Sequence, residues 1–414
     1  MVDWVFSEKT ACRSCGGSTL EDVINLGELY VSSFPKPGEP DGPKVPLNVR
    51  RCSQCGLLQL RHTTNPDLLY RTYWYRSGTN QTMRFALADI SRAMERNVGL
   101  ESGDIVVDTG CNDGTLLDSY AVPRLRKIGF EPASNVAAVA REIPDVSVIN
   151  DYFTSGAPGF DQLRGRVKAV TSIAMFYDLD DPHTFIRDID SILAKDGLWI
   201  IQISYLPSML ERNAFDGICH EHLEYYSLRS IQHLLEQHGF EILDAELVEL
   251  NEGSIRLYVR RAHEGADEGP SARVKSIRAS ESNLGLETRA PYTAFADRVE
   301  SIKDRTTRVI EDAVRTGKRV HAYGASTKGN TLLQYFGLSS KLVQYAWERQ
   351  DQKWGRQTVG THIPIISEEE GRKMNPDYLL MLPWHFASEF VKRESAYLAS
   401  GGRFIVPLPE FRTI

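Results

Sequence analysis

The sequence predicts an α/β protein, with a doubly wound and mostly parallel sheet between a small N-terminal metal-binding module and a second α/β unit. Two observations lead to this fold class. Two CxxC pairs lie near the N-terminus, and the central and C-terminal parts each hold an apolar run followed at once by a small-residue turn and a helix-like segment. Strand, turn and helix in that order begin a parallel sheet with helices on both faces. The 414 residues leave room for two or three domains.

The composition is that of a globular chain and excludes several classes of partner. Hydrophobic residues make up 42% and charged residues 25%. The net charge of -7 opposes the phosphate attraction that nucleic-acid binders use, so we expect no nucleic-acid partner. No apolar run approaches the ~18 residues of a membrane span, and residues 1–8 lack the basic start and apolar stretch of a signal peptide. We therefore expect a cytoplasmic protein without a membrane partner.

The N-terminal cysteines predict a structural zinc site in a module of residues 1–68. Each pair, Cys12 with Cys15 and Cys52 with Cys55, is followed by glycine, which accepts the positive φ of a tight turn. Reduced cytosolic thiols at this spacing are typical of metal ligands, although a dithiol redox pair stays open. Four thiolates suit tetrahedral Zn²⁺ and leave no open coordination position, so we expect catalysis elsewhere.

A second domain, residues 69–265, begins with a cofactor-binding pattern. The apolar run 104–108 leads into the turn 109–114, and a helix-like segment starts at Thr115. A second strand, Ile128 to Phe130, ends at Glu131, where a carboxylate meets ribose hydroxyls in such sheets. Further parallel strands are predicted at 167–174 and 198–203. The turn is not GxGxxG, but a dinucleotide-dependent oxidoreductase stays open as an alternative.

The acidic strand end before the glycine turn resembles the first motif of class I S-adenosylmethionine-dependent methyltransferases. The resemblance implies S-adenosylmethionine as the cofactor, with the acidic strand end serving its methionine or ribose portion. The residues expected at the cofactor are Asp108, Gly110, Asn112, Asp113, Gly114, Glu131 and, after the third strand, Asp151.

Aromatic hydroxyls are concentrated just before this domain. Tyr70, Tyr73, Tyr75 and Ser77 lie within eight residues of one another. Ordinary packing is one interpretation. A tyrosine also joins an apolar body to a polar tip, so these hydroxyls are suited to close over a polar ligand. We expect Tyr75 and Ser77 at the cofactor.

A His-Glu-His cluster, His220 to His222, is a candidate for acid/base chemistry. It is not HExxH, so a helical zinc-protease site is excluded. In an extended segment the two imidazoles share one face, with Glu221 on the other. A single histidine is usually structural, but this cluster follows a strand of the cofactor domain and favours proton transfer.

The C-terminal unit, residues 266–414, is predicted to be Rossmann-like. A charged helix-like stretch leads to a strand, the turn Gly324 to Gly329, and a helix. The turn is not Walker A, because Lys328 precedes Gly329. Backbone N–H groups at the helix start, with Lys328, predict a diphosphate cradle, although a purely structural turn stays open. More strands are expected at 378–382 and 403–406.

Taken in order, the cysteine pairs, the Cys-Asn-Asp-Gly turn, the segment His220 to Ser227 and the turn at Lys328 resemble the sugar C-methyltransferases. That family acts on nucleotide-linked keto-deoxysugars. The resemblance covers nearly the whole chain and implies a nucleotide-diphosphate sugar enclosed between the central and C-terminal domains. It implies that His222 is the base and that Glu221 assists it, and that Tyr70, Tyr73, Tyr75 and Ser77 form the family's tyrosine motif.

The chain departs from the family at two positions expected to face the sugar. Cys219 stands where a tyrosine opens the family's His motif, and 175–178 reads Met-Phe-Tyr-Asp where a histidine often occurs. We expect an enolate formed by His222 and stabilised by Tyr75, Tyr177 or His220. The residues expected at the substrate are Cys219, Tyr225, Ser326, Lys328 and Asn330.

Two other functions stay open from the sequence. One is O-methylation of a sugar hydroxyl, and the other is a non-catalytic assembly role with a vestigial cofactor pocket. We expect a monomer, because three modules in one chain enclose a site without a partner.

Overall fold

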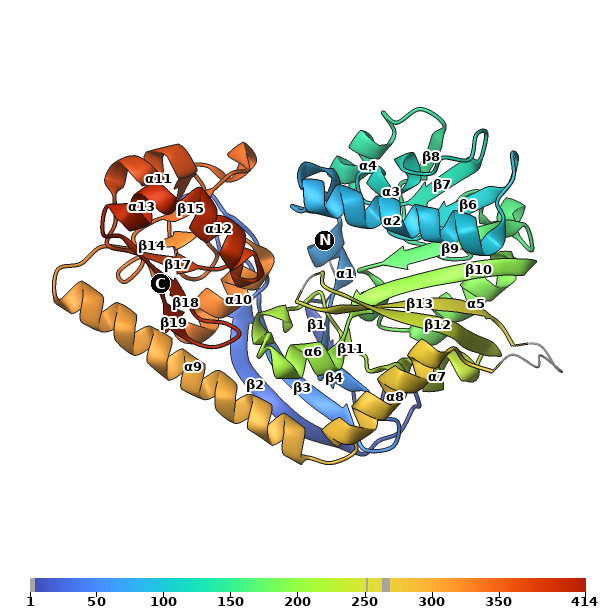
Figure 1. The fold of residues 1–414 in the computed structure, drawn as a ribbon, viewed down its shortest axis with the longest axis horizontal. Coiled ribbons are helices and arrows are strands. Elements are labelled where there is room, and N and C mark those ends of the chain that lie inside the picture. Colours follow the sequence, from blue (N-terminus) through green and yellow to red (C-terminus); the bar gives the residue numbers. More distant parts are fainter. Residues whose placement is uncertain (1–3, 251, 263–268) are drawn as a thin grey trace.

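The structure, a computed structural model, describes residues 4–250, 252–262 and 269–414. Figure 1 shows two α/β lobes, with the blue strands of the N-terminal module running below and between them. Within the described residues, no helix is long and apolar enough to cross a membrane.

The N-terminal module is built from antiparallel strands around a long hairpin. The first sheet pairs β1 with β5, and the second has the order β11-β4-β3-β2. The strand bounds are β1 (Phe6–Glu8), β2 (Leu20–Tyr30), β3 (Lys44–Cys52), β4 (Leu58–Leu60), β5 (His62–Thr64) and β11 (Glu224–Tyr225). Because β11 comes from the segment that follows the predicted His-Glu-His cluster, the module holds that segment in place.

The central lobe is built on a mostly parallel, seven-stranded sheet. Its seven strands have the order β12-β13-β10-β9-β6-β7-β8, and only β13 runs antiparallel to its neighbours. The bounds are β6 (Ile105–Asp108), β7 (Arg126–Phe130), β8 (Val146–Ile149), β9 (Val167–Ile173), β10 (Leu193–Ser204), β12 (Phe240–Val248) and β13 (Ser254–Arg261). All four predicted parallel strands are confirmed, and the chain order reverses between β6 and β9, where such sheets bind ligands.

Helices cover both faces of this sheet. The longest begins where the Asn80 side chain accepts the Thr82 N–H at 2.8 Å and ends at Gly99, whose φ of 62° is left-handed. Its apolar face packs on the sheet through Leu87, Ile90 and Met94. The bounds are α1 (Pro66–Tyr70), α2 (Gln81–Val98), α3 (Thr115–Asp118), α4 (Ser134–Ala140), α5 (Pro182–Ile192), α6 (Leu206–Glu211), α7 (Leu228–Glu236) and α8 (Ala272–Leu284).

The C-terminal lobe is Rossmann-like. Its six strands have the order β16-β15-β14-β17-β18-β19, parallel except for β19. The strands are β14 (Val320–Tyr323), β15 (Ala346–Glu348), β16 (Ile365–Ser367), β17 (Tyr378–Met381), β18 (Arg403–Val406) and β19 (Arg412–Thr413). The helices are α9 (Ala290–Arg315), α10 (Thr327–Phe336), α11 (Glu368–Met374), α12 (Ala387–Arg393) and α13 (Ser395–Ala399). The three strands predicted for this unit are confirmed.

The predicted boundary between residues 265 and 266 lies outside the described residues. The helix that follows it, α8, places Val274 and Ile277 in the hydrophobic core of the central lobe. Packing across the predicted boundary therefore joins α8 to the methyltransferase sheet, whereas α9 contributes to the core of the C-terminal lobe.

One buried carboxylate ties α8 to two other helices. Glu281 accepts the Tyr205 hydroxyl at 2.8 Å and the backbone N–H groups of Leu228 and Arg229 at 2.6 and 3.1 Å. The last two are unpaired donors of the first turn of α7. Glu281 therefore fixes the start of α7, just after the segment that holds the histidines.

We expect Glu281→Ala to lower the free energy of unfolding by about 3 kcal/mol, because it leaves buried donors without an acceptor. Denaturant or thermal unfolding measures the change. Glu287→Ala is the matched control, since that side chain is 50% exposed, and it should change stability by less than about 0.5 kcal/mol. Equal effects of the two substitutions would rule out the capping role.

Candidate active site

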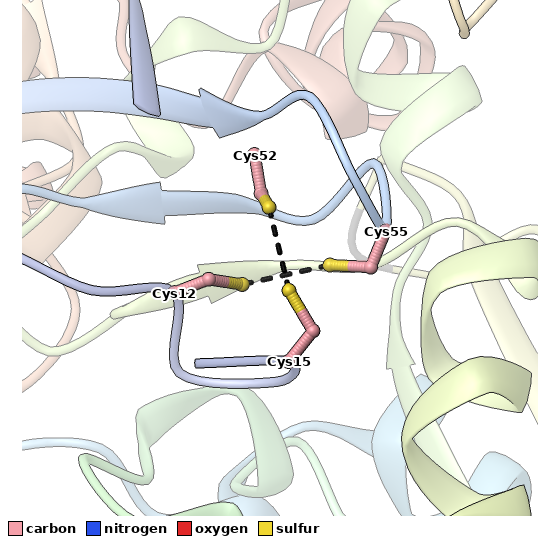
Figure 2. A group of neighbouring side chains, drawn as sticks. All are labelled: Cys12, Cys15, Cys52 and Cys55. Atoms are coloured by element: carbon pink, nitrogen blue, oxygen red, sulfur yellow. Dashed lines mark hydrogen bonds between the residues drawn. The ribbon is translucent and has the colours of Figure 1, made fainter. Parts of the chain in front are cut away.

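The four predicted cysteine ligands converge in the N-terminal module (Figure 2). Their sulfur atoms all lie within 4.8 Å of one another, and the Cys12–Cys55 and Cys15–Cys52 pairs are each 3.5 Å apart. A tetrahedral zinc ion with Zn–S bonds of about 2.3 Å requires sulfur atoms roughly 3.8 Å apart, so this donor set fits zinc. The ion would be held by four thiolates with no position for substrate, which makes the centre structural.

The two turns that present the cysteines have the same backbone geometry. The Cys12 N–H donates to the Gly17 carbonyl at 2.8 Å, and the Cys12 carbonyl accepts the Gly16 N–H at 2.9 Å. Cys52 repeats this pattern with Leu57 and Gly56. Gly16 and Gly56 have φ values of 70° and 81°, as the predicted turn requires.

We expect the purified protein to carry close to one zinc ion per chain, and Cys52→Ser to lose both the metal and thermal stability, because a buried tetrahedral site loses a ligand. Metal analysis and a melting curve measure the two effects. Ser53→Ala, an exposed substitution in the same turn, is the control and should keep the metal. A metal-free wild type with an unchanged melting temperature would contradict the assignment.

A cavity of about 720 Å³ opens between the carboxyl ends of the two parallel sheets. Residues of the central lobe line one side, and residues of the C-terminal lobe close the other. Many of the predicted site residues line this cavity. Nine of them belong to the central lobe and form the walls for the cofactor and the reaction: Tyr75, Ser77, Asp108, Gly110, Asn112, Glu131, Tyr177, Glu221 and His222. Two more, Ser326 and Lys328, form the wall of the C-terminal lobe. Cys219 lines the cavity as well.

The cofactor wall is built around Glu131 at the end of β7. Its two carboxyl oxygens accept the backbone N–H groups of Asn112 and Ala133 at 2.9 and 2.8 Å. The Asn112 side chain accepts the Ser77 N–H at 3.0 Å and donates to the Tyr75 carbonyl at 3.1 Å. The predicted tyrosine segment therefore closes over the glycine turn.

These residues fit S-adenosylmethionine. Glu131 is buried and faces the cavity with a carboxylate suited to ribose hydroxyls. A side chain at Gly110 would fill the cradle, since its Cβ would lie 3.2 Å from Met175. The cofactor would therefore be held by Asp108, Gly110, Asn112 and Glu131.

Three predicted cofactor residues lie outside the cavity lining, which corrects the expectation for them. Asp113 accepts the Gly78 N–H at 2.8 Å and binds the Thr115 hydroxyl, so it supports the tyrosine segment instead. Gly114 has a φ of 79°, and a Cβ there would meet Ile143 at 2.6 Å. Asp151 accepts the Tyr152 N–H at 2.9 Å, and the next three residues line the cavity in its place.

Asp108 lies at the point where the strand order reverses. The pKa of Asp108 is raised to about 7, mainly by burial and also by the charge of Glu131. The hydrogen bond from the Thr171 hydroxyl, at 2.9 Å, acts in the opposite direction. Near neutral pH the carboxyl group is therefore only partly ionised until a cationic group of a ligand favours its charge.

We expect the affinity for S-adenosylhomocysteine to rise from pH 6 to pH 8, because the ammonium group of that ligand binds the ionised carboxylate better than the protonated one. Asp108→Asn should bind about 10-fold more weakly at pH 8 and lose most of the pH dependence. Calorimetric titration measures both. Asp118→Asn, an exposed substitution on α3, should behave as the wild type; a pH-independent wild type would contradict the role of Asp108.

His222 lies on the reaction wall with one ring nitrogen already bound. Its Nδ1 is 2.8 Å from the Gly217 carbonyl, which accepts only if Nδ1 carries the proton. Nε2 is then unprotonated. The ring meets the Tyr177 ring edge-on, with centroids 4.6 Å apart. Burial lowers the pKa of His222 to about 4, and the charge of Lys328 acts in the same direction, so the imidazole is neutral at pH 7.

Glu221 does not orient His222, contrary to the expectation. In the described part of the chain no hydrogen bond or ion pair joins the two side chains, because the Gly217 carbonyl takes that place. Burial raises the pKa of Glu221, while a contact with the Cys219 thiol opposes the shift. The Tyr70 hydroxyl donates to the Glu221 carbonyl at 3.0 Å, which fixes the backbone of the segment.

His220 and Tyr225 are structural. His220 Nε2 lies 3.0 Å from the Val45 carbonyl on β3, outside the cavity lining, so it does not face an enolate. Tyr225 sits in β11 opposite Leu58 and is buried in the core. The short strand β11 pairs with β4 of the N-terminal module, which the motif alone did not reveal.

The C-terminal wall is the turn before α10. The Ser326 side chain caps that helix by accepting the Gly329 N–H at 3.0 Å. Asn330 lies outside the cavity, which corrects its predicted substrate role: its amide donates to the Ser32 hydroxyl at 2.9 Å and so holds the β2–β3 hairpin.

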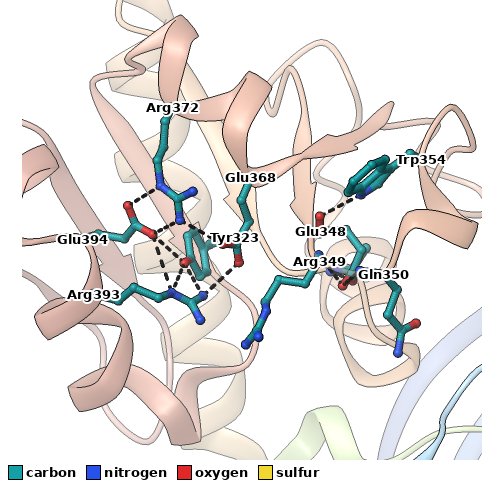
Figure 3. A network of polar contacts seen from close by, with 10 residues as sticks. Tyr323, Glu348, Arg349, Gln350, Trp354, Glu368, Arg372, Arg393 and Glu394 are labelled. Carbon is teal, nitrogen blue, oxygen red and sulfur yellow. Dashed lines mark hydrogen bonds and ion pairs between the residues drawn. The ribbon is translucent and has the colours of Figure 1, made fainter. Parts of the chain in front are cut away.

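A network of charged residues braces this sheet edge (Figure 3). The Tyr323 hydroxyl donates to Glu394 at 2.8 Å, and Arg372 Nε donates to the same carboxylate at 2.9 Å. Nearby, Glu348 accepts the backbone N–H groups of Ala325 and Gln350 at 3.1 and 3.0 Å. Glu348 therefore holds the backbone of the turn next to Lys328.

Sequence reasoning missed several residues of the wall, among them Asp216, Glu252 and His385. Asp178 also lines it and belongs to the segment 175–178 that was expected to face the sugar. His385 had a usable signal, because it follows β17, the strand beside β14 at the reversal of strand order. Glu252 had none, since it lies in the turn between two antiparallel strands and meets its partners only across the lobes.

Comparisons with known proteins agree with this geometry. Three family models match successive parts of the chain: a zinc-binding domain at 12–70, a methyltransferase domain at 80–245 and a C-methyltransferase C-terminal domain at 249–409. The chain is 32% identical over 407 residues to the C-methyltransferase NovU of Streptomyces niveus, covering 97% of this chain and 96% of that protein.

Solved methyltransferase structures resemble part of the chain. A SAM-dependent methyltransferase from Aquifex aeolicus is 17% identical, with a TM-score of 0.32, over 44% of this chain and 97% of its own. Magnesium protoporphyrin IX methyltransferase of Synechocystis is 15% identical, also with a TM-score of 0.32, over 43% of this chain and 79% of its own.

Proposed function

Because the chain belongs to the sugar C-methyltransferase family, we propose that it methylates the carbon next to the ketone of a nucleotide-diphosphate-linked keto-deoxysugar, with His222 as the base. The enzyme class is that of the S-adenosylmethionine-dependent methyltransferases, and the N-terminal module binds zinc. S-adenosylmethionine supplies an electrophilic methyl group on a sulfonium. The enzyme must supply the nucleophile.

A sugar carbon becomes nucleophilic only after it loses a proton. The observation that carries the proposal is the bond from His222 Nδ1 to the Gly217 carbonyl, because it leaves Nε2 as an unprotonated acceptor in the cavity wall. The neutral ring is ready to take the proton, and the backbone carbonyl stabilises the imidazolium that forms.

The Tyr177 hydroxyl supports this chemistry as a donor near the base. Burial raises the pKa of Tyr177 well above its usual value, so the hydroxyl keeps its proton through the neutral range. Tyr75 belongs to the cofactor wall, where its carbonyl binds Asn112. Of the predicted donors to the enolate oxygen, Tyr177 therefore has the best support. Cys219, which also lines the cavity, is proposed to contact the sugar.

The extent of the cavity supports a long acceptor. The cofactor wall occupies the central lobe, and the cavity continues to Ser326, Gln350 and Lys353 at the carboxyl edge of the second parallel sheet. Ligands of such sheets bind where the strand order reverses. A nucleotide attached to the sugar would reach this edge while the keto carbon lies at His222.

We expect His222→Ala to lower turnover by at least about 100-fold, because the proton acceptor is lost. S-adenosylhomocysteine binding should persist, since His222 is not among the residues that would hold the cofactor. Product NMR identifies a C-methyl group, and deuterium from the solvent should enter the carbon next to the ketone in the wild type but not in the variant. His233→Ala, an exposed histidine on α7, is the control. Near-normal turnover of His222→Ala would exclude His222 as the base.

A further inference from the structure

Four charged or polar side chains meet where the two lobes close over the cavity: Asp216, Glu252, Lys328 and His385. Glu252 lies between the other groups. Its Oε2 contacts Lys328 Nζ, and its Oε1 is 2.9 Å from His385 Nδ1. The Trp384 indole donates to Asp216 Oδ2 at 3.0 Å, and Asp216 Oδ1 has no hydrogen-bond partner among the described residues.

The burial of the Lys328–Glu252 ion pair costs free energy of folding. The side chains are only 25% and 6% exposed. A pair withdrawn from water to this degree often contributes nothing to stability, because desolvation offsets the attraction. Glu252 also has a φ of 64°, a left-handed conformation that side chains other than glycine rarely adopt. The buried ion pair and the strained backbone of Glu252 both cost stability, which indicates that the ammonium group has a function at this position.

Lys328 lines the same cavity as His222, Cys219 and Asp216. The charge of Lys328 lowers the pKa of His222. In turn, Asp216 and Cys219 both raise the pKa of Lys328. Burial opposes the charge of Lys328, but Glu252 and Asp216 outweigh it, so the pKa of Lys328 is raised and the ammonium keeps its proton.

The same surroundings disfavour a diphosphate ligand for Lys328. A unit charge 4 Å from another is worth about 4 kcal/mol at an effective dielectric constant of 20. Two carboxylates beside the ammonium would repel each charge of a diphosphate at this scale. An enolate carries a single negative charge, and that charge arises only during the reaction. The ammonium can therefore stabilise it without the cavity holding a permanent excess of negative charge.

We propose that Lys328 is a catalytic residue whose ammonium group stabilises the enolate oxygen, and that Glu252 is the positioning residue that directs it toward the ketone beside His222. The inference rests on the proposed C-methylation and assigns to Lys328 a role other than diphosphate binding. It also accounts for the placement of Glu252, which no motif in the sequence marks.

His222 Nε2 takes the proton from the carbon next to the ketone, the C–H electron pair forms the C=C bond, and the π pair of the ketone moves to the oxygen that faces Lys328. When the carbon takes the methyl group, the ketone re-forms, the C–S bond of the donor breaks and S-adenosylhomocysteine leaves. His222 then releases its proton to water.

The test separates enolisation from methyl transfer. The probes are 4-keto-6-deoxyhexoses linked to thymidine, guanosine and cytidine diphosphate. Deuterium exchange next to the ketone is followed by NMR with S-adenosylhomocysteine bound, and kcat and KM are measured with S-adenosylmethionine. Lys328→Met should lower exchange and kcat together by about 100-fold, because a donor to the oxyanion is lost. KM for the sugar should change less than about 3-fold, as for a loss confined to the transition state.

The other variants test the positioning role. Glu252→Gln keeps the shape but not the charge and should lower exchange about 10-fold with little change in KM. Lys328→Arg should restore part of the exchange, since the cation is kept. Glu249→Gln is the matched control: it lies in the same turn region, is 80% exposed and should behave as the wild type. Calorimetric binding of S-adenosylhomocysteine shows that each variant is folded.

Two results would overturn the inference, and they differ from failure of the proposed function. If Lys328→Met exchanges deuterium as fast as the wild type, or raises KM tenfold with kcat kept, Lys328 binds another part of the substrate. If Glu252→Gln and Glu249→Gln behave alike, Glu252 has no positioning role. If the wild type neither exchanges nor methylates any of the three probes, the proposed function fails together with the inference.

Discussion

The β2–β3 hairpin contacts both lobes and so links the two sides of the cavity. At one end, Cys12 and Cys52 are buried in the same hydrophobic core as the methyltransferase sheet. At the other end, the Tyr30 backbone exchanges two hydrogen bonds with the Gln334 side chain, at 2.8 and 3.2 Å. A zinc ion that joins two distant turns also couples metal binding to folding of the module. The four cysteines lie outside the cavity lining, so the metal centre would act on the chemistry only through the fold.

Burial acts on the acids and bases of this cavity in opposite directions. It raises the pKa of Asp108 and Glu221 and lowers that of His222, so each of these groups moves toward its neutral form. The buried pair of Lys328 and Glu252 keeps its charges because each supports the other. A charge that arises during the reaction has a strong effect on such buried groups, since the effective dielectric constant around them is low. This electrostatic design is consistent with chemistry that creates an anion from a neutral ketone.

Local patterns predicted the elements that carry the chemistry, and they failed where long-range packing decides. The run 104–108 and its glycine turn contained the whole strand–turn–helix unit, because that geometry is encoded in consecutive residues. β15 and β16 have three residues each and were not predicted, since so short a strand has no readable period. His220 and Asn330 have polar side chains at positions that suited a site, but both bind the N-terminal module. No periodicity within their own segments reports what lies on the opposite side.

The sequence by itself determined the cysteine donor set, the order of the three modules and the central strands, and it singled out the His-Glu-His segment, of which His222 lines the cavity. These depend on spacing along the chain, where backbone geometry links a motif directly to its shape. Only the tertiary structure decided which nitrogen of His222 is left free, that Glu221 is separated from it, and that Glu252 meets Lys328 from the other lobe. The reason is that hydrogen bonds and charges act across a few ångströms of space, whether the partners are five positions apart, as His222 and Gly217 are, or 76, as Glu252 and Lys328 are.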